Sequence, residues 1–227
     1  PGRVNQMLQG RSGYSGSARN LAKKCPIAHG RVRSYNLDAR YCYSTRLPIG
    51  IIMIIDTHVH VWEIDPPKYP IGPTAPNWTA LPDEPGTADL LLAEMDEHDV
   101  DWSVLVQTSW STWDNGYIAD SVARFPNRFI GHGLIDPQEA DNATLARYWV
   151  KERGLAGFRF HPMYYPDEEI LLTVQNEPLW EEIADLDVVI QFHLRANDAR
   201  QVGIRAERYT HLRLILDHMG YPQVTEP

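Results

Sequence analysis

Residues 51–62 read Ile-Ile-Met-Ile-Ile-Asp-Thr-His-Val-His-Val-Trp, an apolar run that ends in Asp-Thr-His-Val-His. A continuous apolar run that follows Gly50 is typical of a fully buried β-strand. Successive side chains of a strand point to opposite faces, so Asp56, His58 and His60 are expected to share one face. Two imidazoles at this spacing indicate a site where both bind one metal ion. Two buried, hydrogen-bonded histidines without a metal are the alternative.

The rest of the chain alternates strand patterns with helix patterns. Strands that alternate with helices form a parallel sheet. A doubly wound open sheet is possible, but no Gly-rich phosphate turn follows the first strand. Polar residues at the ends of nearly all the strands favour a (β/α)8 barrel instead. The expected strands are 51–56, 102–107, 129–135, 155–160, 188–194 and 212–217, and the expected helices begin after Thr87 and span 116–125, 139–153, 178–186 and 197–208.

Six strands fall short of the eight that a complete barrel needs. From Met53 to Pro227 the chain offers 175 residues, whereas a barrel typically has about 250. We therefore predict an α/β fold, a (β/α)8 TIM barrel that stops after strand six. Residues 53–227 are expected to form this incomplete barrel domain, and residues 1–52 a basic leader that is disordered or non-native.

Charge is divided unevenly between these two parts. Residues 1–52 carry nine Lys/Arg and one acidic residue, about +8, whereas residues 53–227 carry twelve and twenty-nine, or −17. The net charge of −9 argues against a nucleic-acid partner. No window holds 18 consecutive apolar residues, so we expect no membrane span and a cytoplasmic protein. An organelle transit peptide is the alternative for residues 1–52.

Side chains able to carry chemistry follow the strands. In a barrel, residues at the carboxyl ends of different strands converge on one mouth. His193 closes the fifth strand and is the best third metal ligand, with a plain hydrogen bond to a carbonyl as the alternative. The other candidates at the mouth are Gln107, Ser109, Asp136, Asp217 and His218.

Several further residues are candidates for substrate contact. Arg159 shares a strand face with His161, and its planar guanidinium suits a substrate carboxylate. A purely structural role is equally open for His161. Trp62 and Trp110 lie in loops at the same end and are candidates for lining an aromatic pocket, and Arg195 follows the fifth strand.

These segments resemble the amidohydrolase superfamily, in particular its amidohydrolase-related branch, amidohydrolase-2. The Asp-x-His-x-His strand end is similar to the first barrel strand of that branch, and residues 158–162 resemble its Gly-x-Arg-x-His-Pro segment. The resemblance implies that His58, His60 and His193 hold a divalent metal, zinc first, with manganese or no metal as alternatives. It also implies that His218 lies at the reaction centre, and we assign it a catalytic role with Arg159 and His161.

The activity implied by the resemblance is hydrolysis of an ester, lactone or amide bond in a small carboxylated or aromatic compound. Non-oxidative, metal-dependent decarboxylation is the second possibility, because the branch performs both with the same histidines. In the family, an Asp after strand eight takes the proton, and residues 1–227 include no such strand. A catalytically silent barrel fragment is therefore the third possibility. The expected partners are a small-molecule substrate and a second copy of the chain, paired through exposed barrel edges.

Overall fold

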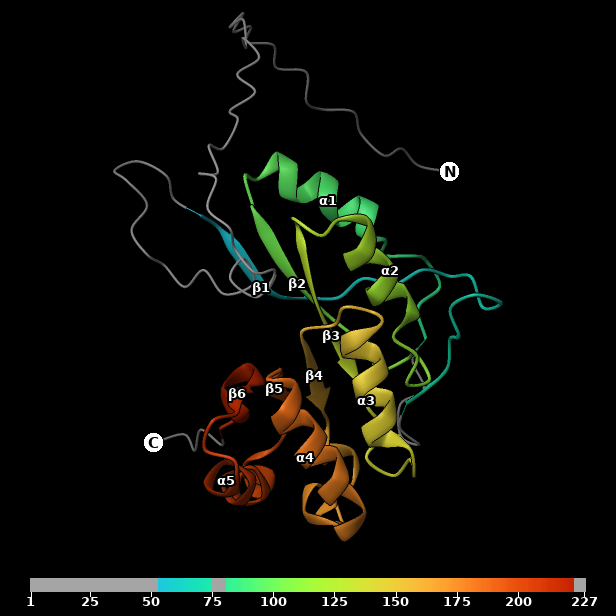
Figure 1. The fold of residues 1–227 in the computed structure, drawn as a ribbon. Helices are drawn as coiled ribbons and strands as arrows, with labels where there is room; N and C mark the ends of the chain where they lie inside the picture. The colour runs from blue at the N-terminus through green and yellow to red at the C-terminus, as the bar shows by residue number, and fades with distance from the viewer. Residues whose placement is uncertain (1–52, 75–80, 223–227) are drawn as a thin grey trace, which may run out of the picture. The chain divides into compact units, whose positions relative to one another are not determined.

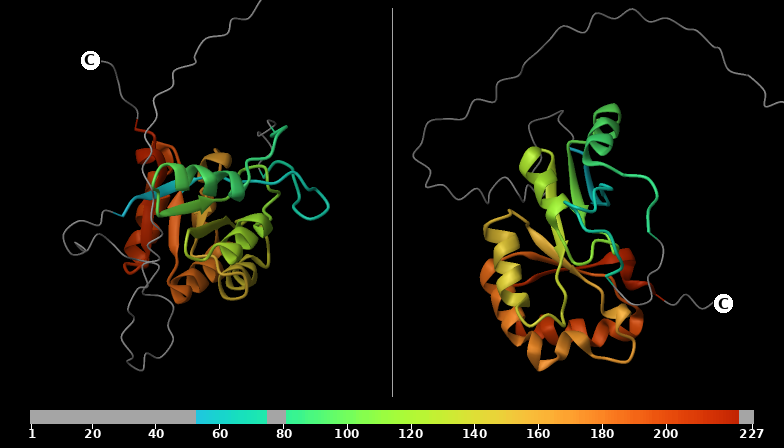
Figure 2. Two further views of the ribbon diagram at one scale, coloured as in Figure 1. Left: turned by 90° about the horizontal axis from the view of Figure 1, so that it is seen from above. Right: turned by 90° about the vertical axis from the view of Figure 1, so that its right-hand side faces the viewer.

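The computed structural model describes residues 53–74 and 81–222, which fold into an α/β unit around one parallel sheet (Figures 1 and 2). Its six strands lie side by side in chain order. They are β1 (Ile55–Val59), β2 (Trp102–Val106), β3 (Phe129–Leu134), β4 (Gly157–Phe160), β5 (Val189–Phe192) and β6 (Arg213–Leu216). This arrangement confirms the predicted fold class, with six of the eight strands of a TIM barrel. The predicted leader, 1–52, lies outside the described residues.

A helix follows each of the first five strands, and Figure 2 shows α2 to α5 running along one face of the sheet. The α-helices are α1 (Ala88–Glu97), α2 (Gly116–Arg124), α3 (Asn142–Lys151), α4 (Glu177–Leu186) and α5 (Ala199–Arg208). Single 3₁₀ turns punctuate the connections: η1 (Pro162–Tyr164), η2 (Ile170–Leu172), η3 (Val174–Asn176), η4 (Ala196–Asp198) and η5 (Asp217–Gly220). Among the described helices, none has the length and apolar character needed to cross a membrane.

Helix α1 begins after Thr87, as predicted, and only a narrow face of the helix is buried. The Thr87 hydroxyl accepts a hydrogen bond from the backbone N–H of Leu90 at 3.2 Å, which satisfies one of the free donors at the helix start. Met95 is buried, and Leu91 and Leu92 are half-buried. Leu90 is 59% exposed and lies outside the packed face. Four leucine and methionine positions within six residues span more of the helix circumference than one packed face covers.

Alternation along the strands separates an apolar face from a polar one. On β4 and β5, Phe160 and Phe192 stack near Trp180 of α4, with ring centroids 5.6 and 6.4 Å from the indole. Burying aromatic side chains of this size contributes about 1.5–3 kcal/mol each. Arg159 and Gln191, which immediately precede these two phenylalanines, are partners in the strand register and are also buried. The interior of the partial barrel is therefore polar where it approaches the strand ends.

Strand β1 is irregular where the two histidines lie. Asp56 pairs with Ser103 and Val59 pairs with Leu105, so β1 advances three residues while β2 advances two. One extra residue of this kind is a β-bulge, which bends a strand and re-aims its side chains. The strand also lies later in the sequence than the predicted 51–56, and residues 51 and 52 fall outside the described part. Simple alternation cannot anticipate such a bulge.

Candidate active site

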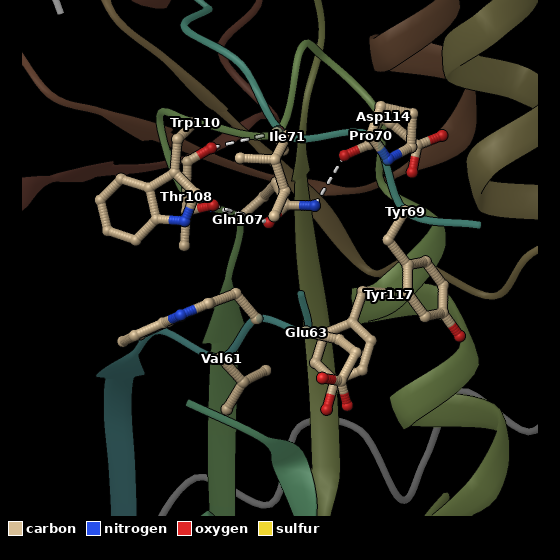
Figure 3. A pocket seen from close by; sticks show the side chains of 12 residues that line it. Val61, Glu63, Tyr69, Pro70, Ile71, Gln107, Thr108, Trp110, Asp114 and Tyr117 are labelled. Atoms are coloured by element: carbon tan, nitrogen blue, oxygen red, sulfur yellow. Dashed lines mark hydrogen bonds between the residues drawn. The ribbon is translucent and has the colours of Figure 1, made fainter. Parts of the chain in front are cut away.

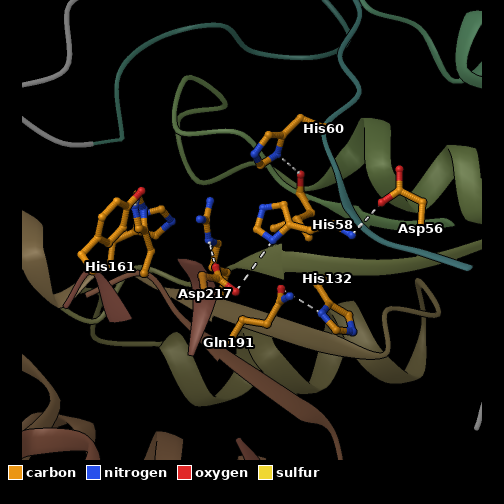
Figure 4. Close-up of polar contacts among 11 residues, drawn as sticks. Asp56, His58, His60, His132, His161, Gln191 and Asp217 are labelled. Carbon is orange, nitrogen blue, oxygen red and sulfur yellow. Dashed lines mark hydrogen bonds and ion pairs between the residues drawn. The ribbon is translucent and has the colours of Figure 1, made fainter. Parts of the chain in front are cut away.

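The two histidines of the first strand lie together at its carboxyl end (Figure 4). The rings of His58 and His60 are perpendicular, with centroids 5.1 Å apart. Nδ1 of His60 lies 2.7 Å from the carbonyl oxygen of Val106. Because a carbonyl only accepts, this nitrogen carries the proton and Nε2 keeps its lone pair. Nε2 of His58 is buried and has no hydrogen-bond partner among the described residues.

A buried ion pair lies beside His58. Nε of Arg159 donates to Oδ2 of Asp217 at 2.6 Å, and both side chains are almost fully buried. The other carboxylate oxygen, Oδ1, lies 3.8 Å from Nδ1 of His58. Sequence reasoning placed Arg159 at the mouth for a substrate carboxylate but gave Asp217 no role. The available signal was the position of Asp217 after β6, on the same inward-facing row as Arg159.

His193 and His161 form a second imidazole pair on the neighbouring strand ends. Their Nδ1 atoms are 3.2 Å apart, and Nε2 of His193 lies 3.1 Å from the hydroxyl of Tyr221. His161 is buried and stacks on Tyr164, whose hydroxyl lies 2.7 Å from Oγ of Ser109. Nε2 of His161 is a second buried nitrogen without a hydrogen-bond partner in the described part of the chain.

His218 joins the two imidazole pairs. Its ring centroid is 5.4 Å from the rings of both His58 and His193. His218 and Met219 have positive φ angles of 51° and 57°, a conformation that costs non-glycine residues about 1 kcal/mol or more each. This turn immediately after β6 leaves His218 exposed at the mouth while Asp217 stays buried.

The structure therefore brings five of the predicted histidines to one mouth, but not as a closed three-ligand set. In residues 53–74 and 81–222, the one group of three candidate ligands whose atoms all lie within 4.8 Å is Glu94, Glu97 and His98, on the exposed surface of α1. His58 and His60 are adjacent, whereas both ring nitrogens of His193 face other side chains. The assignment of His193 as third ligand stays a prediction.

Burial and a neighbouring cation keep four of these imidazoles, His58, His60, His161 and His193, neutral. Burial, then the neighbouring Arg159 cation, lowers the pKa of His58 from 6.5 to about 4 and that of His193 to about 3. Burial also lowers the pKa of His60, although its hydrogen bond to Val106 opposes the shift. The same two causes, burial and Arg159, hold the pKa of His161 well below its usual value. Neutral imidazole is the form that binds metal ions.

The predicted aromatic pair lines a separate small pocket beside the mouth, shown in Figure 3. The rings of Trp62 and Trp110 meet edge to face at 5.5 Å. The loop after β1 is held against this wall by the backbone N–H of Gly72, which donates to the carbonyl of Trp110 at 2.9 Å. Gln107 and Tyr69 complete the wall. Arg195 is exposed at the start of η4, where its N–H donates to Asp198, and no described contact ties it to the histidines.

A family model for amidohydrolases matches residues 55–226, which hold all of these histidines. The chain belongs to the amidohydrolase family. The match confirms the predicted resemblance to the amidohydrolase-2 branch, and it applies to residues 55–226.

Solved structures of the superfamily share this fold at low sequence identity. A probable 2-pyrone-4,6-dicarboxylic acid hydrolase from Acinetobacter baumannii, with citric acid bound, matches 74% of this chain and 59% of its own length, with 20% identity and a TM-score of 0.60. A candidate for the same activity from Pseudomonas putida matches 74% of this chain and 57% of its own, with 23% identity and a TM-score of 0.58. A 2,6-dihydroxybenzoate decarboxylase from Rhizobium matches 75% and 67%, with 18% identity and a TM-score of 0.51.

The amidohydrolase chain described here thus spans about three fifths of the length of the two hydrolase structures. At these identities the likeness establishes the fold. The members that share it include hydrolases and decarboxylases, so the family is one of enzymes in which hydrolysis and decarboxylation both occur.

Proposed function

We propose that this amidohydrolase barrel belongs to a metal-dependent hydrolase that opens an ester, lactone or amide bond in a small carboxylated or aromatic compound. The observation that carries the proposal is the cluster of imidazoles around a buried arginine at the strand ends. His58, His60, His193 and His218 lie within ring-contact distance of one another in a chain of neighbours. Family membership supports hydrolysis as the general class.

The residues present fit a divalent metal. His58 and His60 offer adjacent neutral imidazoles, and Nε2 of His58 is a buried polar atom that lacks a partner among the described residues. Imidazole nitrogen is a common ligand of zinc, and manganese is the alternative for a site that also uses oxygen ligands. A bound metal of this kind polarises a carbonyl and lowers the pKa of its bound water toward about 7. His193 is the third ligand in this proposal.

The other residues bind and orient the substrate. Arg159 places a cation at the mouth, which suits a carboxylate or the oxygen of an opening ester. His218 is exposed next to His58 and is placed to donate a hydrogen bond to the substrate carbonyl or to move a proton. Trp62 and Trp110 offer edges and faces for a flat ring near the mouth. Their place beside the strand ends favours conjugated or aromatic acids.

The test is an assay of the full 227-residue chain with and without metal. After treatment with a chelator, the protein is reloaded with Zn²⁺ or Mn²⁺ and given 2-pyrone-4,6-dicarboxylate and a panel of aryl esters and carboxylated lactones. Acid release should appear in the loaded protein, vanish with the chelator, and be absent in His60→Ala. His98→Ala, which removes a histidine from the exposed surface of α1, is the matched control and should stay active.

Two outcomes would replace the proposal with its alternatives. Release of CO₂ without ester cleavage, from 2,6-dihydroxybenzoate for example, would identify a decarboxylase that uses the same histidines. Metal bound by the mouth histidines without turnover of any probe would identify a catalytically silent barrel unit. A small-molecule substrate is the partner that the proposal needs, and self-association through the sheet edges is proposed below as a property of this chain.

A further inference from the structure

The carboxylate of Asp217 uses its two oxygens for two different partners. Oδ2 accepts from Nε of Arg159 at 2.6 Å, and Oδ1 faces Nδ1 of His58 at 3.8 Å. Figure 4 shows Asp217 with dashed lines to both sides. The side chain of Asp217 is 1% exposed, so the carboxylate is shielded from water by its neighbours. Burying a charged carboxylate is costly unless it is paired. The position of Asp217 between two strand ends therefore calls for a specific role.

His58 is turned so that its two ring nitrogens face different environments. Nδ1 faces Asp217, and Nε2 is the buried atom without a partner in the described residues. The two ring nitrogens of His60 also face different environments. Nδ1 lies against the carbonyl oxygen of Val106, and Nε2 takes no part in that hydrogen bond. Histidines that bind metals almost always donate their second ring N–H to a carboxylate or a backbone carbonyl. The two imidazoles match this arrangement, one with each kind of acceptor.

We propose that Asp217 is a positioning residue for the metal site: it accepts Nδ1–H of His58 and thereby presents Nε2 of His58 to the metal. The inference rests on the proposed metal-dependent function. The distance of 3.8 Å is longer than a hydrogen bond, so a small rotation of the His58 side chain closes the contact when the metal binds. The carbonyl of Val106 serves His60 in the same way and is fixed by the backbone of β2.

Arg159 holds the carboxylate in place for this task. It comes from β4, whereas Asp217 follows β6, so the pair spans the inward face over β5. Gln191 of β5 is the register partner of Arg159, and its Oε1 lies 3.0 Å from Nδ1 of His132. The hydrogen bond from Arg159 and the burial of the carboxylate limit the rotation of Asp217. The primary task of Arg159 is therefore to fix Asp217, and contact with a substrate carboxylate is secondary.

The experiment compares metal affinity with folding stability. Asp217→Asn keeps the shape of the side chain and removes its charge. Because this variant leaves Arg159 buried without a counter-charge, the double variant Asp217→Asn/Arg159→Gln is made as well, so that the fold carries no unpaired charge there. Zn²⁺ affinity is measured by competition with a chelator, and the absorption spectrum of the Co²⁺-loaded protein reports the geometry of the ligands.

The matched control is a carboxylate in a different ion pair. Glu177 pairs with Arg205, whose side chain is 2% exposed, at 2.7 Å between α4 and α5. Glu177→Gln should lower the melting temperature without changing Zn²⁺ affinity. Both Asp217 variants should bind Zn²⁺ about 10- to 100-fold more weakly than the unmodified chain, as expected when an outer partner of a metal ligand is lost. Their Co²⁺ spectra should also shift.

The results separate this inference from the proposed function. A folded double variant with unchanged Zn²⁺ affinity and an unchanged Co²⁺ spectrum would overturn the role of Asp217 and leave the metal site standing. An unmodified chain that takes up no Zn²⁺, Co²⁺ or Mn²⁺ would overturn the metal-dependent function and this inference with it. Equal losses of affinity in Glu177→Gln and the Asp217 variants would show a general effect of stability and would also overturn the positioning role.

Discussion

Arg159 and Asp217 form a buried ion pair that joins the ends of β4 and β6. The donor Nε and the acceptor Oδ2 are 2.6 Å apart, with 4% and 1% of the respective side chains exposed. A pair of this kind is not by itself evidence of stability, because taking both charges out of water is costly. Removing one partner is costlier still, because the other charge is then buried alone. The pair therefore makes the strand ends sensitive to single substitutions.

Asp217→Ala should lower the free energy of unfolding by about 3–5 kcal/mol, because it leaves the guanidinium of Arg159 unpaired. The measurement is urea unfolding followed by circular dichroism. The control is Asp89→Ala, which breaks an exposed pair with Arg124 at 2.8 Å and should cost far less, because solvent screens exposed charges. If both variants lost the same free energy of unfolding, burial would not be the reason that Asp217 matters more than Asp89. Asp217→Ala/Arg159→Met should recover most of the loss.

The sequence predicted the architecture well because the buried strands are distinctive. Apolar runs at β2, β4 and β5 stand out from the amphipathic helices around them, and the strand order follows from their alternation with helices. Boundaries were less accurate: the strand predicted at 51–56 lies at Ile55–Val59, and the bulge there has no sequence signature. Its cause is the pairing of β1 with β2, which local preferences do not determine.

The candidate site was predicted in part. The carboxyl ends of parallel strands meet at one mouth, so listing the polar residues there found His58, His60, His193 and His218. The pairing of Arg159 with Asp217 was missed, because it joins residues 58 positions apart whose contact depends on the curvature of the sheet. The contact of His193 with Tyr221 was also missed, since it needs the left-handed turn after β6.

Metal binding should stabilise the fold through the mouth histidines. A ligand that binds only the folded state adds about 2.7 kcal/mol at 100 times its dissociation constant. Added Zn²⁺ should therefore raise the melting temperature of the unmodified chain, and a chelator should reverse the rise. His60→Ala should lose the rise and His98→Ala should keep it. The opposite result would place the metal on the exposed α1 group of Glu94, Glu97 and His98.

Acid should destabilise the protein through His132. Burial lowers the pKa of this side chain, although its contact with Gln191 opposes the shift. The unfolded chain, with a histidine pKa near 6.5, then binds more protons than the folded one below that pH. The contribution of His132 to stability is therefore complete above about pH 6.5 and is lost as the pH falls, by at most about 1.4 kcal/mol per pH unit.

The measurement for His132 is urea unfolding of the chelator-treated protein at pH 7.5 and 5.5. His132→Asn keeps a donor for Gln191 but cannot titrate, so its stability should fall less between the two pH values than that of the unmodified chain. His98→Asn, on the exposed surface of α1, should behave as the unmodified chain does. An identical pH dependence in His132→Asn and the unmodified chain would show that His132 is not responsible.

Self-association should arise at the β6 edge of the sheet. In the described part of the chain β6 pairs with β5 alone, and Leu216 on it is 48% exposed. Unpaired backbone groups next to apolar side chains invite pairing with another copy, and a lysine on such an edge discourages it. We expect the 227-residue chain to sediment as concentration-dependent oligomers and Leu216→Lys to shift them toward monomer. Leu90→Lys, on exposed α1, should leave the distribution unchanged. A monodisperse monomer at all concentrations, or an equal shift in both variants, would remove the edge as the cause.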